Sequence, residues 1–348
     1  MQTNPNLRPR RPAPPPTAAQ LFAGLHGPSP RRALARAITL LESTQPADRA
    51  RANALLDLVE AHQPARPTFR LGLSGTPGVG KSTFVETFGR QLAEAGHRIA
   101  ILAVDPTSSL SGGSILGDKT RMETLARHPN VFIRPSPTAG RSGGVGVASR
   151  AALRCCEAAG YDFLIVETVG VGQAEYDVHR LTDAFLLLAQ PAAGDDLQGI
   201  KRGILELADV IAVNKVDRLP EAARQTAREL RQGLHLAPAR PDDWTVPILT
   251  IAGLTGQGLP ELAEVLREYD AKMTAGGHRA RRRAAQRLHW LRDRCEQTVL
   301  HDLRAFLATR ARTTDELQRI IDEHVSLTAT TDVLLQDFYH YQSPVSPQ

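Results

Sequence analysis

The segment from Gly75 to Thr83, GTPGVGKST, constrains the fold of this chain more than any other feature of its sequence. It fits the pattern G-x-x-x-x-G-K-[ST] of a phosphate-binding loop, which connects a β-strand to an α-helix. Both flanking elements are predicted, because the apolar run Phe69–Ser74 precedes the loop and a helical pattern that begins at Phe84 follows it. The chain is therefore expected to contain a P-loop domain of the α/β class.

Each part of this loop has a chemical role in binding phosphate. The glycines let backbone N–H groups turn toward phosphate oxygens, and the positive N-terminus of the following helix faces the same anion. Lys81 is expected to reach the β- and γ-phosphates, and Ser82 to offer its hydroxyl to Mg²⁺. The residues expected to bind nucleotide in this loop are Gly75, Pro77, Gly78, Val79, Gly80, Lys81, Ser82 and Thr83.

Short apolar runs alternate with helical patterns as far as Asp270, which predicts βαβ units around a buried, mainly parallel sheet. The expected strands are Phe69–Ser74, Arg98–Asp105, Val131–Arg134, Phe163–Glu167, Ala184–Ala189, Val210–Asn214 and Ile248–Ile251. Helices are expected before the sheet at Arg31–Ser43 and Asp48–His62, and after it at His278–Arg310, Thr314–Val325 and Thr331–Tyr341.

A second motif, Asn214-Lys215-Val216-Asp217, follows a predicted strand and matches the guanine motif N-K-x-D. The Asp217 carboxylate can accept two hydrogen bonds from the ring N–H and the amino group of guanine, an edge that adenine lacks. Asn214 is expected to brace the loop, and the stem of Lys215 to lie along the base. The two motifs together predict that the chain binds GTP.

Two further strands are predicted to end in acidic residues, Asp105 and Glu167. Ligands of open α/β sheets bind at the carboxyl edge, so both side chains should lie near the phosphate loop. Mg²⁺ favours carboxylates together with water, which makes both residues candidate metal ligands. The segment 167–170 takes the place of the D-x-x-G element, with the Gly170 N–H as the expected sensor of the γ-phosphate.

Two loops rich in Gly and charged residues, 108–122 and 193–203, are predicted to be switches beside the nucleotide. Only five of the 42 basic residues are lysine, and all but Lys272 fall in these loops or in the two nucleotide motifs. Because the wide fork of arginine cannot replace a compact ammonium, this distribution draws attention to the loop lysines. The residues expected to couple the switches to nucleotide or partner are Lys119, Asp195, Gln198 and Lys201.

The segments GTPGVGKST, AVDPTSS, GDKTRM, ETVGVGQAE, GDDLQGIKRG and NKVD, in this order and spacing, resemble the MeaB/MMAA (ArgK-type) family of metallochaperone-class P-loop GTPases. The resemblance covers roughly Leu21 to Tyr341. It implies a homodimer, joined by C-terminal helices, that hydrolyses GTP slowly with Mg²⁺. It also implies a chaperone that gates cofactor loading, protection and reactivation of an adenosylcobalamin-dependent acyl-CoA mutase, above all methylmalonyl-CoA mutase. Cobalamin would be met only through that partner.

The resemblance also assigns roles to residues. The loop that contacts guanine O6 usually contains Ser-Ala in the family, and here Ala252 and Gly253 take that place. No Gln directly follows Gly170, so we expect a slow intrinsic rate that the partner raises, through Lys201. The implied catalytic residues are Lys81, Asp105, Glu167, Gly170 and Lys201. The implied Mg²⁺ ligands are Ser82, Asp105, Asp118 and Glu167.

Two other classes of enzyme share part of this pattern. A nickel-insertion GTPase has the same fold, but it would need a His-rich run or Cys and His ligands, whereas the 11 His are scattered. Cys155 and Cys156 fall in a helical stretch and are expected to be buried small side chains. A P-loop kinase of a small substrate would need an acceptor site, and the guanine motif argues for a switch instead.

Neither a nucleic acid nor a membrane is expected as a partner. The run Arg279, Arg281, Arg282 and Arg283 suggests a nucleic-acid-bound GTPase, but no aromatic residues interleave with it. We expect instead a charged arm face, or a dimer contact with acids such as Asp302 and Glu316. No stretch of 18 consecutive apolar residues predicts a membrane helix.

The expected organisation has four regions: a disordered Pro- and Arg-rich tail (1–18), an N-terminal helical extension (19–65), the GTPase domain (66–271) and a helical dimerisation arm (272–348). The acid-free, Arg-rich start resembles a mitochondrial transit peptide, but its Pro run cannot form an amphipathic helix. A bacterial cytoplasmic location is therefore expected over the mitochondrial matrix.

Overall fold

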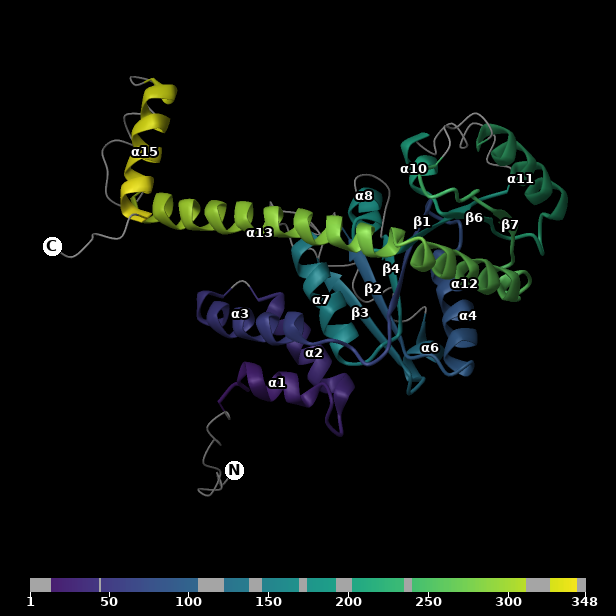
Figure 1. Ribbon diagram of the computed structural model, residues 1–348, viewed down its shortest axis with the longest axis horizontal. Coiled ribbons are helices and arrows are strands. Elements are labelled where there is room, and N and C mark those ends of the chain that lie inside the picture. Colours follow the sequence, from purple (N-terminus) through teal and green to yellow (C-terminus); the bar gives the residue numbers. More distant parts are fainter. Residues whose placement is uncertain are drawn as a thin grey trace, which may run out of the picture. The chain divides into compact units, whose positions relative to one another are not determined.

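A parallel β-sheet forms the centre of the computed structural model, which describes residues 14–43, 45–105, 122–137, 146–168, 174–191, 202–234, 240–310 and 326–342. The sheet has seven strands in the order β3-β2-β4-β1-β5-β6-β7, and all neighbours pair in parallel (Figure 1). Its strands are β1 (Phe69–Gly75), β2 (Ile99–Asp105), β3 (Val131–Pro137), β4 (Phe163–Thr168), β5 (Ala184–Ala189), β6 (Val210–Val213) and β7 (Ile248–Thr250). The predicted P-loop α/β fold with a mainly parallel sheet is confirmed.

Helices cover both faces of this sheet, which is why its central strands are buried throughout and read as nearly continuous apolar runs. One face packs against α4 (Lys81–Glu94), α6 (Glu123–Arg127) and α12 (Leu259–Ala275). The other face packs against α7 (Gly146–Ala158), α8 (Ala174–His179), α10 (Arg202–Leu207) and α11 (Pro220–Leu234). Successive strand residues alternate between the two cores: Leu71 and Leu73 face α4, whereas Leu164 and Val166 face α7.

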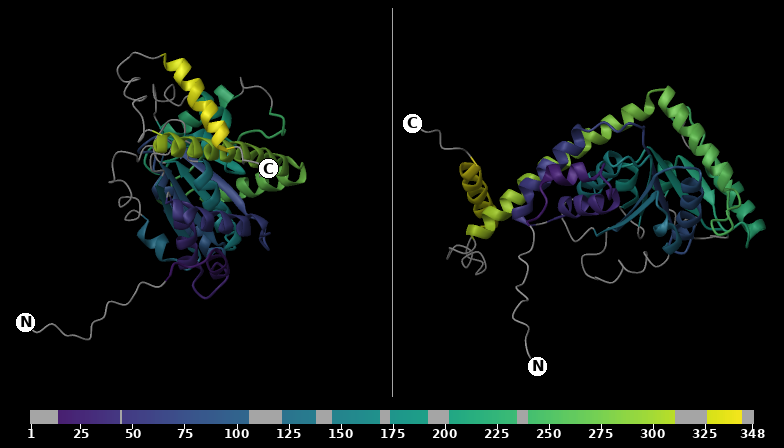
Figure 2. Two further views of the ribbon diagram at one scale, coloured as in Figure 1. Left: turned by 90° about the vertical axis from the view of Figure 1, so that its left-hand side faces the viewer. Right: turned by 90° about the horizontal axis from the view of Figure 1, so that it is seen from below.

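Three N-terminal helices precede the sheet; the second and third pack onto α7, and the first packs against those two (Figure 2). The two predicted helices are found as α2 (Pro30–Leu41) and α3 (Pro46–Ala61), each with a proline in its first turn. An additional short helix, α1 (Ala18–Gly24), begins where the predicted tail ends. It starts there because the Thr17 hydroxyl accepts a hydrogen bond from the Gln20 N–H and the Gln20 side chain accepts one from the Thr17 N–H.

The chain divides into two compact units, Met1–Gln286 and Arg287–Gln348, and the division falls inside α13 (His278–Arg310). The predicted bounds of α13 are confirmed. In the second unit, the ring of Phe306 packs 5.6 Å from those of Phe338 and Tyr341 on α15 (Leu327–Gln342). The predicted helix at 314–325 lies outside the described residues. None of the helices that the structure describes is long and apolar enough to cross a membrane.

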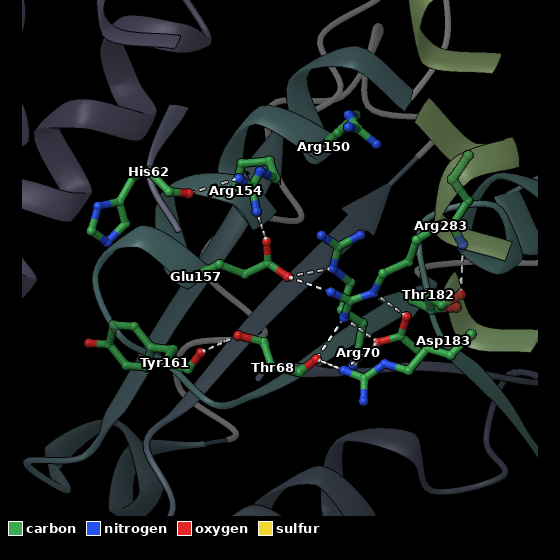
Figure 3. A network of polar contacts seen from close by, with 12 residues as sticks. His62, Thr68, Arg70, Arg150, Arg154, Glu157, Tyr161, Thr182, Asp183 and Arg283 are labelled. Carbon is green, nitrogen blue, oxygen red and sulfur yellow. Dashed lines mark hydrogen bonds and ion pairs between the residues drawn. The ribbon is translucent and has the colours of Figure 1, made fainter. Parts of the chain in front are cut away.

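A network of buried ion pairs lies where β1 and β5 begin (Figure 3). The Arg70 guanidinium donates to Glu157 at 2.7 Å, and Arg154 donates to the other oxygen of the same carboxylate. The Asp183 carboxylate accepts from the Arg70 N–H at 3.0 Å and from the Arg283 guanidinium at 2.7 and 2.6 Å. Removing one partner of such a buried pair leaves an uncompensated charge, so the network holds these elements in one arrangement.

The arginine run at the start of α13 binds buried or partly buried acids of the first unit, so the expectation of a charged arm face is wrong for three of its four members. Arg279 donates to Asp270 at 2.7 Å, and Arg282 donates to the fully buried Asp209 at 3.1 Å. Arg283 binds Asp183 as described above. Arg281 differs from them, since it donates to the Gly276 carbonyl at the junction of α12 and α13, at 2.9 Å. Glu316 lies outside the described residues.

The network makes the folded state sensitive to acid. Burial alone would raise the pKa of Asp183, but the hydrogen bonds and charge of Arg283, with the charges of Arg70 and Arg279, hold this pKa below its ordinary value. A carboxyl group with a lowered pKa stabilises the fold above its unfolded pKa, and the contribution is lost as the pH falls through the folded value. The stability of the chain should therefore fall below about pH 5.

Asp183→Asn should lower the free energy of unfolding at pH 7 and flatten its decline toward pH 3, because this carboxylate is then absent. Urea titrations at a series of pH values measure both effects. Asp270→Asn is the matched control, since burial raises the pKa of Asp270 despite its contact with Arg279. This control should not flatten the decline, and an equal flattening in both variants would contradict the role of Asp183.

Candidate nucleotide-binding site

The phosphate loop joins the carboxyl end of β1 to the first turn of α4, as its sequence predicts. Gly80 caps α4 with φ +100°, and a Cβ on it would lie 2.8 Å from the Asn214 amide nitrogen, so only glycine fits this position. Val79 is fully buried in the core under the loop, whereas Pro77 and Gly78 are exposed. Ser82 and Thr83 occupy the first turn of α4, where free N–H groups and the helix dipole favour an anion.

Lys81 folds back over the loop that it follows. Its ammonium donates to the Gly75 carbonyl at 2.6 Å, and the contact is partly buried. A compact ammonium on a flexible stem at the N-terminus of α4 can neutralise phosphate oxygens that bind in the same loop.

Asn214 connects the two predicted nucleotide motifs with one buried side chain. Its amide nitrogen donates to the Val79 carbonyl in the phosphate loop at 2.8 Å. Its amide oxygen accepts from the Gly253 N–H, also at 2.8 Å, in the loop where contact with guanine O6 is expected. The side chain therefore fixes the phosphate loop and the base loop to each other.

Lys215 adds an exposed contact to the same arrangement, since its ammonium donates to the Gly78 carbonyl at 2.7 Å. Its backbone has φ +64°, an uncommon value for a residue with a side chain, and it follows directly on Asn214. Asp217 is exposed in the turn that follows, two residues further along. In the base loop, the Ala252 N–H donates to the Gln257 carbonyl at 2.9 Å, and Ala252 is buried.

The acidic candidates lie at the carboxyl edge of the sheet, beside the phosphate loop. Glu167 is buried on β4, which lies between β2 and β1, in register with Ala103 and Leu73. Asp105 is the last residue of β2, and its side chain lies outside the part that the structure describes. One contact that sequence reasoning missed lies here: the Thr168 hydroxyl donates to the Ser74 hydroxyl at 3.1 Å and links the ends of β4 and β1.

The donor set fits a hard cation such as Mg²⁺. The Ser82 hydroxyl and a carboxylate at the neighbouring strand end are oxygen ligands of the kind that Mg²⁺ prefers, and this ion usually keeps waters and nucleotide phosphates as further ligands. Among the side chains that are described, no group of three or more His, Cys, Asp or Glu gathers into a metal site.

The cysteines of α7 lie in the hydrophobic core. Cys155 and Cys156 are fully buried, as predicted, and burial raises the pKa of the Cys155 thiol to about 12. Several predicted residues lie outside the described ranges, so their roles stay predictions: Asp118, Lys119, Gly170, Asp195, Gln198 and Lys201.

Comparison with known proteins identifies the relatives of this chain. The family model described as methylmalonyl Co-A mutase-associated GTPase MeaB matches residues 34–308. The mitochondrial methylmalonic aciduria type A homolog of Mus musculus is 42% identical, over 88% of this chain and 76% of that protein. The GTPase ArgK of Escherichia coli is 44% identical, over 78% of this chain and 82% of its own.

One solved structure is similar to this chain over most of its length. The crystal structure of a LAO/AO transport system kinase has a TM-score of 0.68 and 33% sequence identity, covering 93% of this chain and 97% of the other.

Asn214→Ala should destabilise both loops, because it leaves the Val79 carbonyl and the Gly253 N–H without this partner. Each buried group left unsatisfied costs about 1–3 kcal/mol, and urea unfolding measures the loss. Lys215→Ala is the matched control: its contact with the same loop is exposed and should cost less than about 1 kcal/mol. Equal losses in the two variants would contradict the bridging role of Asn214.

Proposed function

Because this chain belongs to the MeaB family of methylmalonyl Co-A mutase-associated GTPases, we propose that it binds GTP, hydrolyses it to GDP and phosphate, and serves an adenosylcobalamin-dependent acyl-CoA mutase. Methylmalonyl-CoA mutase is the proposed partner, and the proposed role is to gate cofactor loading, protection and reactivation. The observation that carries the proposal of GTP binding is the bridge made by Asn214, which joins a phosphate loop to a guanine motif.

In this proposal the phosphate loop and the first turn of α4 bind the nucleotide phosphates, with Lys81 against the β- and γ-phosphates. Ser82, Asp105 and Glu167 would hold Mg²⁺ directly or through water, with Asp118 from the first predicted switch. When bound, the ion would neutralise negative charge between the β- and γ-phosphates. Asp217 would accept the two hydrogen bonds of guanine, and Gly170 would sense the γ-phosphate.

We propose a slow intrinsic rate that the mutase raises, since no Gln directly follows Gly170 to orient the attacking water. Lys201, with Lys119, Asp195 and Gln198 in the predicted switches, would couple partner binding to hydrolysis. Cobalamin would be bound by the partner and not by this chain.

A homodimer is proposed as well. Several large apolar side chains are exposed on the parts of α13 and α15 that the structure describes in the second unit, and such surfaces are typical of association sites. These are Leu288, Leu291, Val299, Leu300, Leu327, Val333, Tyr339 and Tyr341.

Asp217→Asn tests the identity of the base. An amide cannot accept two hydrogen bonds from guanine, so affinity for GTP should fall roughly tenfold to a hundredfold, and affinity for xanthosine triphosphate should rise. Equilibrium titration with fluorescent analogues of both nucleotides measures the two affinities. Asp242→Asn is a control on an acid that pairs with Arg240 instead. Unchanged GTP affinity in Asp217→Asn would contradict the guanine assignment.

Lys201→Ala tests the coupling to the mutase. The intrinsic rate of phosphate release should be unchanged, and the stimulation by a methylmalonyl-CoA mutase should be lost, because the charge supplied to the transition state is removed. Phosphate release is measured with and without the mutase. Full stimulation of the variant would contradict the proposed role of Lys201.

A kinase of a small substrate is the second candidate, because the solved structure that resembles this chain is named as a transport system kinase. Product analysis separates the two functions. A GTPase releases GDP and free phosphate, whereas a kinase transfers the phosphate to an acceptor.

A further inference from the structure

The first turns of α13 hold the connection between α8 and β5. We call Arg279, Arg282, Arg283 and Gln286 the α13 root, and residues 180–183 the α8–β5 connection. Gln286 donates to the Thr182 carbonyl at 2.8 Å, and Arg283 forms a two-pronged pair with Asp183 (Figure 3). All of these residues belong to the first compact unit.

The α13 root also contacts the end of α8 and the start of β1. His179, the last residue of α8, is partly buried, and burial and then the charge of Arg282 lower its pKa to about 4, which keeps the ring neutral beside that guanidinium. Arg283 further donates to the Thr68 carbonyl, just before β1, at 2.6 Å. The α13 root therefore joins the start of the strand that carries the phosphate loop to the end of α8.

The α8–β5 connection also packs directly against β1. Gly72 lies in the middle of β1, and a Cβ on it would come within 2.8 Å of the Thr182 hydroxyl and 2.9 Å of a Val178 methyl group. The Thr182 hydroxyl itself donates to the Val178 carbonyl at 2.9 Å. Because the connection is packed closely against β1, we expect a displacement of α8 to act on the α13 root at its other contacts.

The N-terminal end of α8 follows the predicted nucleotide-sensing segment in the chain. α8 begins at Ala174, shortly after β4, which carries Glu167, and after the predicted γ-phosphate sensor Gly170. α8 also touches α10, because a Cβ on Gly203 would meet the Tyr176 hydroxyl, and α10 begins at the end of the second predicted switch, 193–203. One short helix thus links the segment of the predicted γ-phosphate sensor and the second predicted switch to the α13 root.

We propose that the α13 root is the output element of the nucleotide site: it holds the α8–β5 connection in one position with GTP and in another with GDP. This inference rests on the proposed function, because it needs a nucleotide whose γ-phosphate acts on α8. Arg282, Arg283 and Gln286 are positioning residues in it, and they act through α8.

Reciprocity gives the test. If GTP and GDP stabilise the α13 root to different extents, then by thermodynamic linkage a substitution that removes the contacts of the root must change the ratio of the affinities for GTP and GDP. In the full chain, Gln286→Leu removes the donor to Thr182, and Gly72→Ala displaces the same connection from the opposite side. Each should change the ratio of the dissociation constants for a non-hydrolysable GTP analogue and GDP about fivefold or more.

Arg281→Gln is the matched control: among the described residues Arg281 bonds to the Gly276 carbonyl and the His278 ring at the start of α13, and not to the α8–β5 connection, so the ratio should be unchanged. A purely structural role for the α13 root would lower the melting temperature, or weaken both nucleotides equally, without changing the ratio. An unchanged ratio in both test variants overturns the inference.

If a variant fails to fold, hydrogen exchange of the unaltered chain tests whether the α13 root responds to the nucleotide. Amides of residues 278–286 should exchange at different rates with the GTP analogue and with GDP. Equal rates overturn the inference while leaving nucleotide binding intact. Failure of the unaltered chain to bind either nucleotide overturns the proposed function itself, so the two failures are distinguishable.

Discussion

The ion pair and hydrogen bonds of the buried Asp183 carboxylate fix the first turns of α13 to the sheet. It accepts a hydrogen bond from the backbone of Arg70 at the start of β1, and it receives both prongs of the Arg283 guanidinium. Its own N–H donates a bond to the Arg70 carbonyl at 2.8 Å. A charge in this position is stable only with its partners in place, so β1, β5 and the start of α13 can be assembled in one way.

Asn214 has the corresponding role at the opposite edge of the sheet. Its two hydrogen bonds fix the phosphate loop to the base loop, as Asp183 fixes the start of β1 to α13. β1 is thus held at both ends, by a carboxylate where it begins and by an amide where it passes into the loop. A strand fixed in this way transmits small shifts without bending, since packed interiors have low compressibility.

Most of the fold follows from local patterns in the sequence. The seven strands were predictable because strands buried on both faces read as apolar runs, and the loop glycines mark where the chain must turn. The pairing of Asn214 with Val79 and Gly253 could be expected only in outline, because it joins residues that lie far apart in the sequence. The burial of the arginine run could not be predicted from the sequence, because buried and exposed arginines look the same in a helical pattern. The partners of the run also come from three separate parts of the chain: Asp183, Asp209 and Asp270.

The division of the chain inside α13 has a consequence for how this protein can be cut or recombined. A fragment ending at residue 271, the boundary suggested by the sequence pattern, would keep both nucleotide motifs yet strip Asp183 of Arg279 and Arg283. A fragment that retains these guanidinium partners and the Gln286 amide must continue at least to Gln286. A chimaera that exchanges the second unit therefore needs its junction inside the continuous helix α13, and not in a loop.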